Sequence, residues 1–142
     1  IHLAAHDDSV FQSIIVLATF DKLETVIRGQ TNALLGSVLG AAVREPTDVV
    51  FGWKTGLKIS EIRPIDLAPK IKAKTLVIHG ERDEMAPPSA GKSLFDSLPK
   101  GKGNEWLLIP EAGHSNILIT DYPLYATMAE WLLKNITTPS GD

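Results

Sequence analysis

Three short apolar runs, separated by longer segments with helical periodicity, constrain the fold of this chain more than any other feature. The runs lie at about residues 12–19, 74–79 and 105–109 and are rich in Ile, Val and Leu. Apolar runs of this length are typical of strands that are buried on both faces, as in a parallel sheet. We therefore predict an α/β fold of about three parallel strands with helices on both faces.

The segments around these runs carry the predicted helices. We predict five of them, at residues 1–6, 23–29, 31–43, 89–98 and 121–135. Gly29 should end the second, and Gly36 and Gly40 should weaken the third. Residues 46–69 predict largely irregular structure, because prolines bound them, although VVFGWKTGL within this segment is also compatible with a short helix.

Composition excludes several classes of protein. The chain has 142 residues, 44% hydrophobic and 22% charged, which is typical of one globular domain with a core. A net charge of −3 gives no electrostatic case for nucleic acid, and apolar runs of about seven residues are too short to span a membrane. Without cysteine, neither a disulfide nor a thiolate zinc site can form.

The chain begins at Ile1, and IHLAAHDD has neither the basic start nor the long apolar stretch of a signal peptide. We expect the chain to be a piece of a longer protein, with residues 1–136 forming part of one domain and residues 137–142 a polar tail. The true N-terminus, which would carry any targeting signal, is not visible in this sequence. The sequence therefore leaves the compartment of the protein open, and a cytoplasmic location is the default expectation.

An acid and a histidine follow the second and third apolar runs. Asp83 lies in HGERDEMAPP, residues 79–88, and His114 lies in PEAGHSN, residues 110–116. Both should lie just past the carboxyl ends of parallel strands, where sites form in such sheets. An acid and a histidine so placed are typical of two members of a Ser-His-Asp triad. No serine of this chain occurs in the G-x-S-x-G pattern of the third member.

These motifs resemble the C-terminal half of an α/β hydrolase, most of all the serine esterase and peptidase branch with dienelactone-hydrolase-like and prolyl-oligopeptidase-like enzymes. The acid motif of that family, H-G-x-x-D-x-x-x-P, matches HGERDEMAP, and its G-H motif matches AGHSN. In addition, SIIVLATFDKLETV resembles the sixth strand with its following helix, and IRPIDLAPKIKAKTLVIHG resembles the lead-in to the seventh. The resemblance covers roughly residues 1–136.

The resemblance implies a serine hydrolase of ester, thioester or peptide bonds that needs no cofactor and no metal. Asp83 would orient the imidazole of His114, and His114 would be the general base. The nucleophilic serine would lie on the order of ten residues before Ile1, outside this chain. The chain alone should then be inactive, and the strand at 12–19 should pair with the missing N-terminal half or with a second copy.

Each candidate has a competing interpretation as an ordinary residue. Asp83 is also compatible with a turn residue, and His114 with a surface loop histidine. Glu81 and Glu84 are best explained as solvated loop charges. His79 ends a strand, and we expect it to be structural and satisfied by a backbone group.

Other residues give weaker indications of a site. His2 and His6 have the i, i+4 spacing of metal ligands, with Asp7 or Asp8 as a further oxygen donor, although surface residues are the favoured interpretation. Ser37 lies between glycines but without the elbow spacing, which favours helix packing. Phe20 and residues 51–53 are compatible with either a substrate pocket or the core. Trp106 and Trp131 fit core positions on a strand and a helix.

A non-catalytic function is the alternative to the hydrolase. In that case the chain is an α/β fragment that binds a partner, or itself, through the open sheet edge at residues 12–19.

Overall fold

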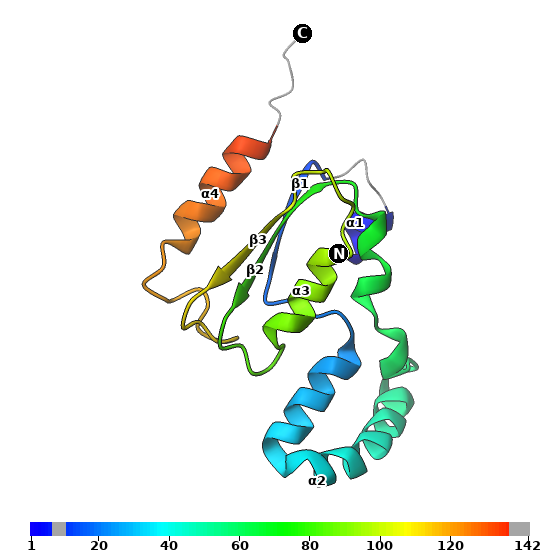
Figure 1. Ribbon diagram of the computed structural model, residues 1–142. Helices are drawn as coiled ribbons and strands as arrows, with labels where there is room; N and C mark the ends of the chain where they lie inside the picture. The colour runs from blue at the N-terminus through cyan, green and yellow to red at the C-terminus, as the bar shows by residue number, and fades with distance from the viewer. Residues whose placement is uncertain (7–10, 137–142) are drawn as a thin grey trace.

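The structure is a computed structural model that describes residues 1–6 and 11–136. Its centre is a parallel three-stranded sheet in the order β1-β2-β3, with β2 in the middle (Figure 1). The strands are β1 (Ser13–Leu17), β2 (Lys74–Gly80) and β3 (Glu105–Ile109). The three parallel strands predicted from the apolar runs are therefore confirmed.

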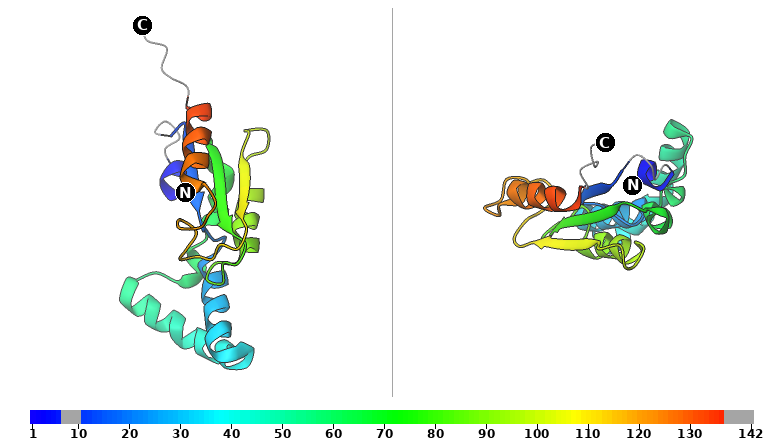
Figure 2. Two further views of the ribbon diagram at one scale, coloured as in Figure 1. Left: turned by 90° about the vertical axis from the view of Figure 1, so that its left-hand side faces the viewer. Right: turned by 90° about the horizontal axis from the view of Figure 1, so that it is seen from above.

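Alternate side chains of the central strand enter two separate cores, because successive residues of a strand point to opposite faces. Leu76 and Ile78 pack on one face, whereas Val77 packs on the other. The first core includes Leu124 and Trp131 of α4 (Leu124–Asn135). The second includes residues of α3 (Pro88–Asp96) and α1 (His2–His6). Figure 2 shows α4 and α3 on opposite sides of the sheet, so helices cover both faces as predicted.

The segment after β1 differs most from the sequence prediction. The structure places one long element there, α2 (Leu23–Thr55), which Figure 1 shows as two helical arms that extend away from the sheet. The arms meet at Gly36, whose φ of 74° and ψ of 167° only glycine adopts readily. The predicted helix end at Gly29 is therefore wrong. The prediction of irregular structure from Pro46 onward is also wrong, because Pro46 lies inside the second arm.

The chain returns to the sheet through three short 3₁₀ helices. These are η1 (Ile59–Glu61), η2 (Pro64–Asp66) and η3 (Ala68–Lys70). Ala68 and Ile71 are buried in the core that α3 and α1 also cover, which fixes the path into β2. Among the described helices, none is both long and apolar enough to cross a membrane.

Candidate active site

The loop after β2 buries the carboxylate of Asp83. The strand ends at Gly80, and the chain turns so that Asp83 is only 3% exposed. The Oδ1 atom of Asp83 accepts hydrogen bonds from the backbone N–H groups of Met85 (3.0 Å) and Ala86 (2.8 Å). Such bonds hold an aspartate side chain in one orientation, because its two oxygens cannot exchange without breaking them. We call residues 81–86 the acid loop.

The loop after β3 carries His114. The backbone turns sharply at Glu111, where φ is 61°, and Ala112 is buried. The N–H of Gly113 donates to the side-chain oxygen of Asn116 at 2.7 Å, which closes a turn around His114. The side chain of His114 is 36% exposed, so its ring is accessible from one side. We call residues 110–116 the histidine loop.

The two loops are fastened to each other by backbone and side-chain contacts. The N–H of Glu81 donates to the carbonyl of Ile109 at 3.0 Å, and the N–H of Arg82 donates to the carbonyl of Ala112 at 2.8 Å. The guanidinium of Arg82 also pairs with the carboxylate of Glu111. A Cβ at position 80 would overlap the carbonyl of Ala112, so only glycine permits this approach.

This arrangement brings the two predicted site residues together. The Oδ2 atom of Asp83 lies 2.9 Å from Nδ1 of His114, which is hydrogen-bond distance. Because a carboxylate only accepts, the shared hydrogen lies on Nδ1 when the acid is ionised. The Nε2 atom of His114 has no hydrogen-bond partner among the described residues. An imidazole held in this way presents a free lone pair on Nε2 to a proton donor.

The remaining histidines are placed as structural or surface residues. His79 is fully buried, and its Nε2 lies 2.8 Å from the carbonyl oxygen of Ala86, the backbone partner expected for it. His2 and His6 lie with ring centroids 4.5 Å apart on an exposed face. Within residues 1–6 and 11–136, no three potential metal ligands gather. Asp7 and Asp8 lie outside the described residues.

The other candidates do not join the site. Ser37 is exposed on α2 directly after Gly36, so a helix and not a strand lies immediately before it. Glu81 and Glu84 are exposed in the acid loop, as expected. Trp53 is 84% exposed, which excludes it from the core, whereas Trp131 is buried as predicted. Phe51 lines an apolar pocket of about 490 Å³ on the second arm of α2.

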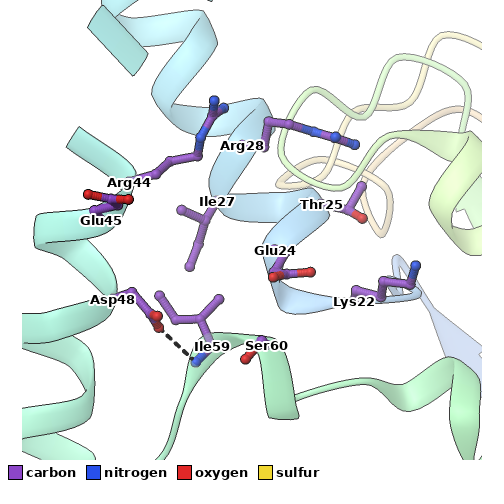
Figure 3. A pocket seen from close by; sticks show the side chains of 10 residues that line it. All are labelled: Lys22, Glu24, Thr25, Ile27, Arg28, Arg44, Glu45, Asp48, Ile59 and Ser60. Carbon is purple, nitrogen blue, oxygen red and sulfur yellow. Dashed lines mark hydrogen bonds between the residues drawn. The ribbon is translucent and has the colours of Figure 1, made fainter. Parts of the chain in front are cut away.

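A second, more polar pocket lies between the two arms of α2 and η1. Its volume is about 480 Å³, and Figure 3 shows charged side chains from both arms around it. Asp48 accepts the N–H of Ile59 at 3.1 Å, which fastens η1 to the second arm. The first arm touches the acid loop, because the side-chain amide of Gln30 donates to the carbonyl of Glu84 at 3.3 Å. The pocket is lined by Lys22, Glu24, Thr25, Ile27, Arg28, Arg44, Glu45, Asp48, Ile59 and Ser60.

Sequence reasoning did not single out the ion pair between Arg82 and Glu111. Nothing in the sequence marks two exposed charges that lie in different loops as partners. The proximity of Gly113 and Asn116 was a usable indication, because an asparagine side chain often closes a turn within a few residues.

Comparisons with known proteins relate the chain to the α/β hydrolases. The model of the prolyl oligopeptidase family matches residues 45–138, about two thirds of the chain. The alpha/beta hydrolase domain-containing protein aho-3 of Caenorhabditis elegans is 38% identical over 53 residues, which are 37% of this chain and 15% of that protein. Both matches connect the chain to the α/β hydrolases through its sequence.

Solved structures extend the likeness to the fold. The Mycobacterium tuberculosis protein Rv0554 aligns with a TM-score of 0.62 at 16% identity, over 96% of this chain and 61% of that one. The monoacylglycerol lipase of Paleococcus ferrophilus aligns with a TM-score of 0.58 at 18% identity, over 95% and 63%. A cold-adapted esterase from an Arctic intertidal metagenomic library aligns with a TM-score of 0.57 at 13% identity, over 95% of this chain and 43% of that one.

The chain thus spans less than two thirds of each of these relatives. Three parallel strands, helices on both faces and loops at the carboxyl ends of β2 and β3 form part of the α/β-hydrolase fold. Together with the family match over residues 45–138, this architecture shows that the chain belongs to the prolyl oligopeptidase family of α/β hydrolases.

Proposed function

We propose that this chain supplies the acid and the base of a serine hydrolase that cleaves ester, thioester or peptide bonds of a small-molecule or peptide acyl substrate. Asp83 is the acid and His114 the base. The observation that supports the proposal is the 2.9 Å contact between Oδ2 of Asp83 and Nδ1 of His114 at the ends of β2 and β3. The match to the prolyl oligopeptidase family also supports the proposal, and an esterase and a lipase share the fold.

The proposed reaction uses the free Nε2 atom of His114. This atom takes the proton of a serine hydroxyl while the serine oxygen bonds to the acyl carbon, and the same proton then passes to the departing group. Asp83 keeps the hydrogen of the ring on Nδ1 and stabilises the imidazolium that forms. Water repeats the sequence in place of the leaving group, which releases the acid and restores the serine. Neither a cofactor nor a metal enters these steps.

The serine in this proposal comes from polypeptide outside the chain. Two observations support this. No serine lies in a G-x-S-x-G pattern, and Ser37, which has glycines nearby, is helical and exposed on α2. A nucleophile elbow requires a strand directly before the serine.

The experiment is the labelling of the full-length gene product with a fluorophosphonate, which reacts with activated serines. Labelling should be strong in the native protein and should be lost in the His114→Ala and Asp83→Ala variants. His2→Ala is the matched control and should leave labelling unchanged. A coding sequence without G-x-S-x-G in the roughly twenty codons before Ile1 would contradict the proposal, as would labelling that survives His114→Ala.

A partner at β1 is the second part of the proposal, because β1 has only one neighbouring strand in the described sheet. Its free side offers backbone donors and acceptors next to apolar side chains, and such an edge pairs readily. The partner in this proposal is either the N-terminal part of an α/β-hydrolase fold, carried by polypeptide outside this chain, or a second copy of the chain. If the fluorophosphonate test fails, a non-catalytic fragment that associates through this edge becomes the better explanation.

A further inference from the structure

We propose that His79 is a positioning residue for the acid Asp83, and that it acts by holding the carbonyl of Ala86. The proposal rests on the function proposed above, because it gives the pair of Asp83 and His114 its roles. It goes further by assigning a task to a buried histidine that does not touch the reacting atoms.

The first observation is the direction of the hydrogen bond of His79. A carbonyl oxygen only accepts, so the 2.8 Å contact requires that Nε2 of His79 carries a hydrogen and donates it to Ala86. The same Nε2 lies 3.4 Å from Oδ2 of Asp83. His79 therefore borders the very oxygen that bonds to His114.

The second observation is what Ala86 does with its other backbone group. Its N–H donates to Oδ1 of Asp83 at 2.8 Å. One residue thus receives a bond from His79 and gives a bond to Asp83. The carbonyl and the N–H of Ala86 belong to adjacent peptide planes that share its Cα, so a bond that holds the carbonyl restrains the N–H as well. With Oδ1 held by that N–H, the carboxylate offers Oδ2 to His114.

The third observation is that the ring of His79 is closely enclosed by its neighbours. It is fully buried and stacks on Trp106 with ring centroids 5.9 Å apart and planes inclined by 22°. The ring also meets Gly91 of α3, where a Cβ would overlap the imidazole near Nδ1. A rigid donor is what positioning requires, because an acid that shifts by a fraction of an ångström loses its hydrogen-bond geometry.

The Nδ1 atom of His79 gives a fourth indication. It is buried and has no hydrogen-bond partner in the described part of the chain. A buried polar atom without a partner is costly, so a hydrophobic side chain would be the better choice if packing were the only task at this position. The donor on Nε2 explains why a histidine lies here.

The test compares His79→Gln with His79→Leu in the 142-residue chain. Glutamine can place an N–H donor near the position of Nε2, whereas leucine fills a similar volume without a donor. The first readout is the downfield proton NMR signal of the His114 ring N–H that bonds to Asp83. The second is the hydrogen exchange of the Met85 and Ala86 amides. Neither readout needs a nucleophile, so a failure of labelling and a failure of this proposal can be told apart.

The leucine variant should lose the His114 signal and exchange its Met85 and Ala86 amides about 5- to 10-fold faster, as expected for one hydrogen bond. The glutamine variant should keep the signal and the slow exchange. The Trp131 amide in α4 reports general loosening and should change little in either. Equal losses in both variants, or an unchanged His114 signal in the leucine variant, would overturn the proposal.

Gly91→Ala provides a second route if the leucine variant does not fold. It keeps the donor but forces the ring of His79 to shift. The His114 signal should weaken and the exchange of the Ala86 amide should quicken, without removal of any polar group. A folded Gly91→Ala protein with an unchanged signal would also contradict the proposal.

Discussion

Oδ2 of Asp83 lies 2.9 Å from Nδ1 of His114, although 31 positions separate the two residues in sequence. The parallel pairing of β2 with β3 causes this proximity, because Gly80 lies opposite Ile109 where the two strands end together. Each loop then needs only a few residues to reach the other. The backbone hydrogen bonds from Glu81 to Ile109 and from Arg82 to Ala112 hold the two loops together.

The first prediction concerns the acid. Under the proposed mechanism, Asp83→Asn in the full-length protein should lower kcat about 10⁴-fold, because the amide favours the wrong tautomer of His114 and no longer stabilises the imidazolium. Ester or peptide turnover gives kcat, and circular dichroism checks the fold. Glu84→Gln, in the same loop but exposed, is the matched control and should stay close to the native rate. A loss below tenfold for Asp83→Asn would argue against its role as the acid.

The sequence predicted the sheet and the two polar loops because both depend on short-range patterns of apolar and polar residues. A strand that is buried on both faces needs a continuous apolar run, and β1, β2 and β3 each have one. The pairing of Asp83 with His114 then follows from strand direction. Because β2 and β3 are parallel neighbours, the loops that follow them leave the sheet at the same edge.

The sequence did not predict the course of α2. Gly29 and Pro46 are residue types that usually end helices, and here both lie within helical structure. Gly29 keeps a helical backbone, and a Cβ at this position would lie 4.0 Å from the carbonyl oxygens of Glu84 and Met85 in the acid loop. Pro46 lies inside the second arm, although an interior proline removes one helical hydrogen bond and its ring crowds the carbonyl four residues earlier, so proline here weakens the helix without ending it. The break falls at Gly36 because the left-handed φ is required where the two arms turn, which depends on tertiary structure.

The second prediction concerns the chain by itself. The purified 142-residue chain should hydrolyse p-nitrophenyl acetate no faster than the background of an exposed histidine. The nucleophile and the oxyanion hole supply most of the rate in this chemistry, and the sequence has no elbow for either. Ser37→Ala should leave this background unchanged. Turnover well above it that Ser37→Ala abolishes would show that the nucleophile had been misassigned.

The third prediction tests the core that α4 covers. Ile78 is completely buried at the centre of β2, so Ile78→Ala should lower the free energy of unfolding by about 2–5 kcal/mol. Urea denaturation followed by circular dichroism measures this loss. Leu34→Ala on α2 is the control, because Leu34 is 79% exposed and the expected change is within about 0.5 kcal/mol. Similar losses for both variants would contradict the assignment of this core.

The fourth prediction concerns an exposed ion pair in η2. The hydrogen bond from Arg63, at 2.6 Å, and its positive charge hold the pKa of Asp66 below the ordinary 3.8. The folded pKa lies below the unfolded one. The pair therefore adds its small stabilisation above about pH 4 and loses it as the pH falls through the folded pKa. Arg63→Gln should raise the pKa of Asp66 toward 3.8, as measured by carboxyl ¹³C NMR during a pH titration.

The control for this titration is Lys92→Gln, which removes a different surface ion pair, that with Asp96. It should leave the titration of Asp66 unchanged. An Asp66 titration that does not move in Arg63→Gln would show that the pair does not persist in solution.

The fifth prediction concerns the free side of β1. Hydrogen bonds from Lys74 N to Gln12 O (3.1 Å) and from Ala18 N to Ile78 O (2.9 Å) flank the strand. In a parallel ladder the groups that face the neighbour alternate, so the N–H of Ile15 points to the open edge. Two copies related by a two-fold axis can pair these edges in antiparallel fashion and extend the sheet to six strands. The isolated chain should therefore form dimers at tens of micromolar in light scattering.

Ile15→Pro should abolish these dimers, because it removes a donor on the open edge while leaving the bonds to β2 in place. Ile15→Ala is the matched control. It loses the same apolar packing but keeps the N–H, so its dimer should persist with an affinity close to that of the native chain. A clean monomer of the native chain at these concentrations would exclude pairing between copies. Equal weakening by proline and alanine would instead assign the association to side-chain packing and away from the backbone edge.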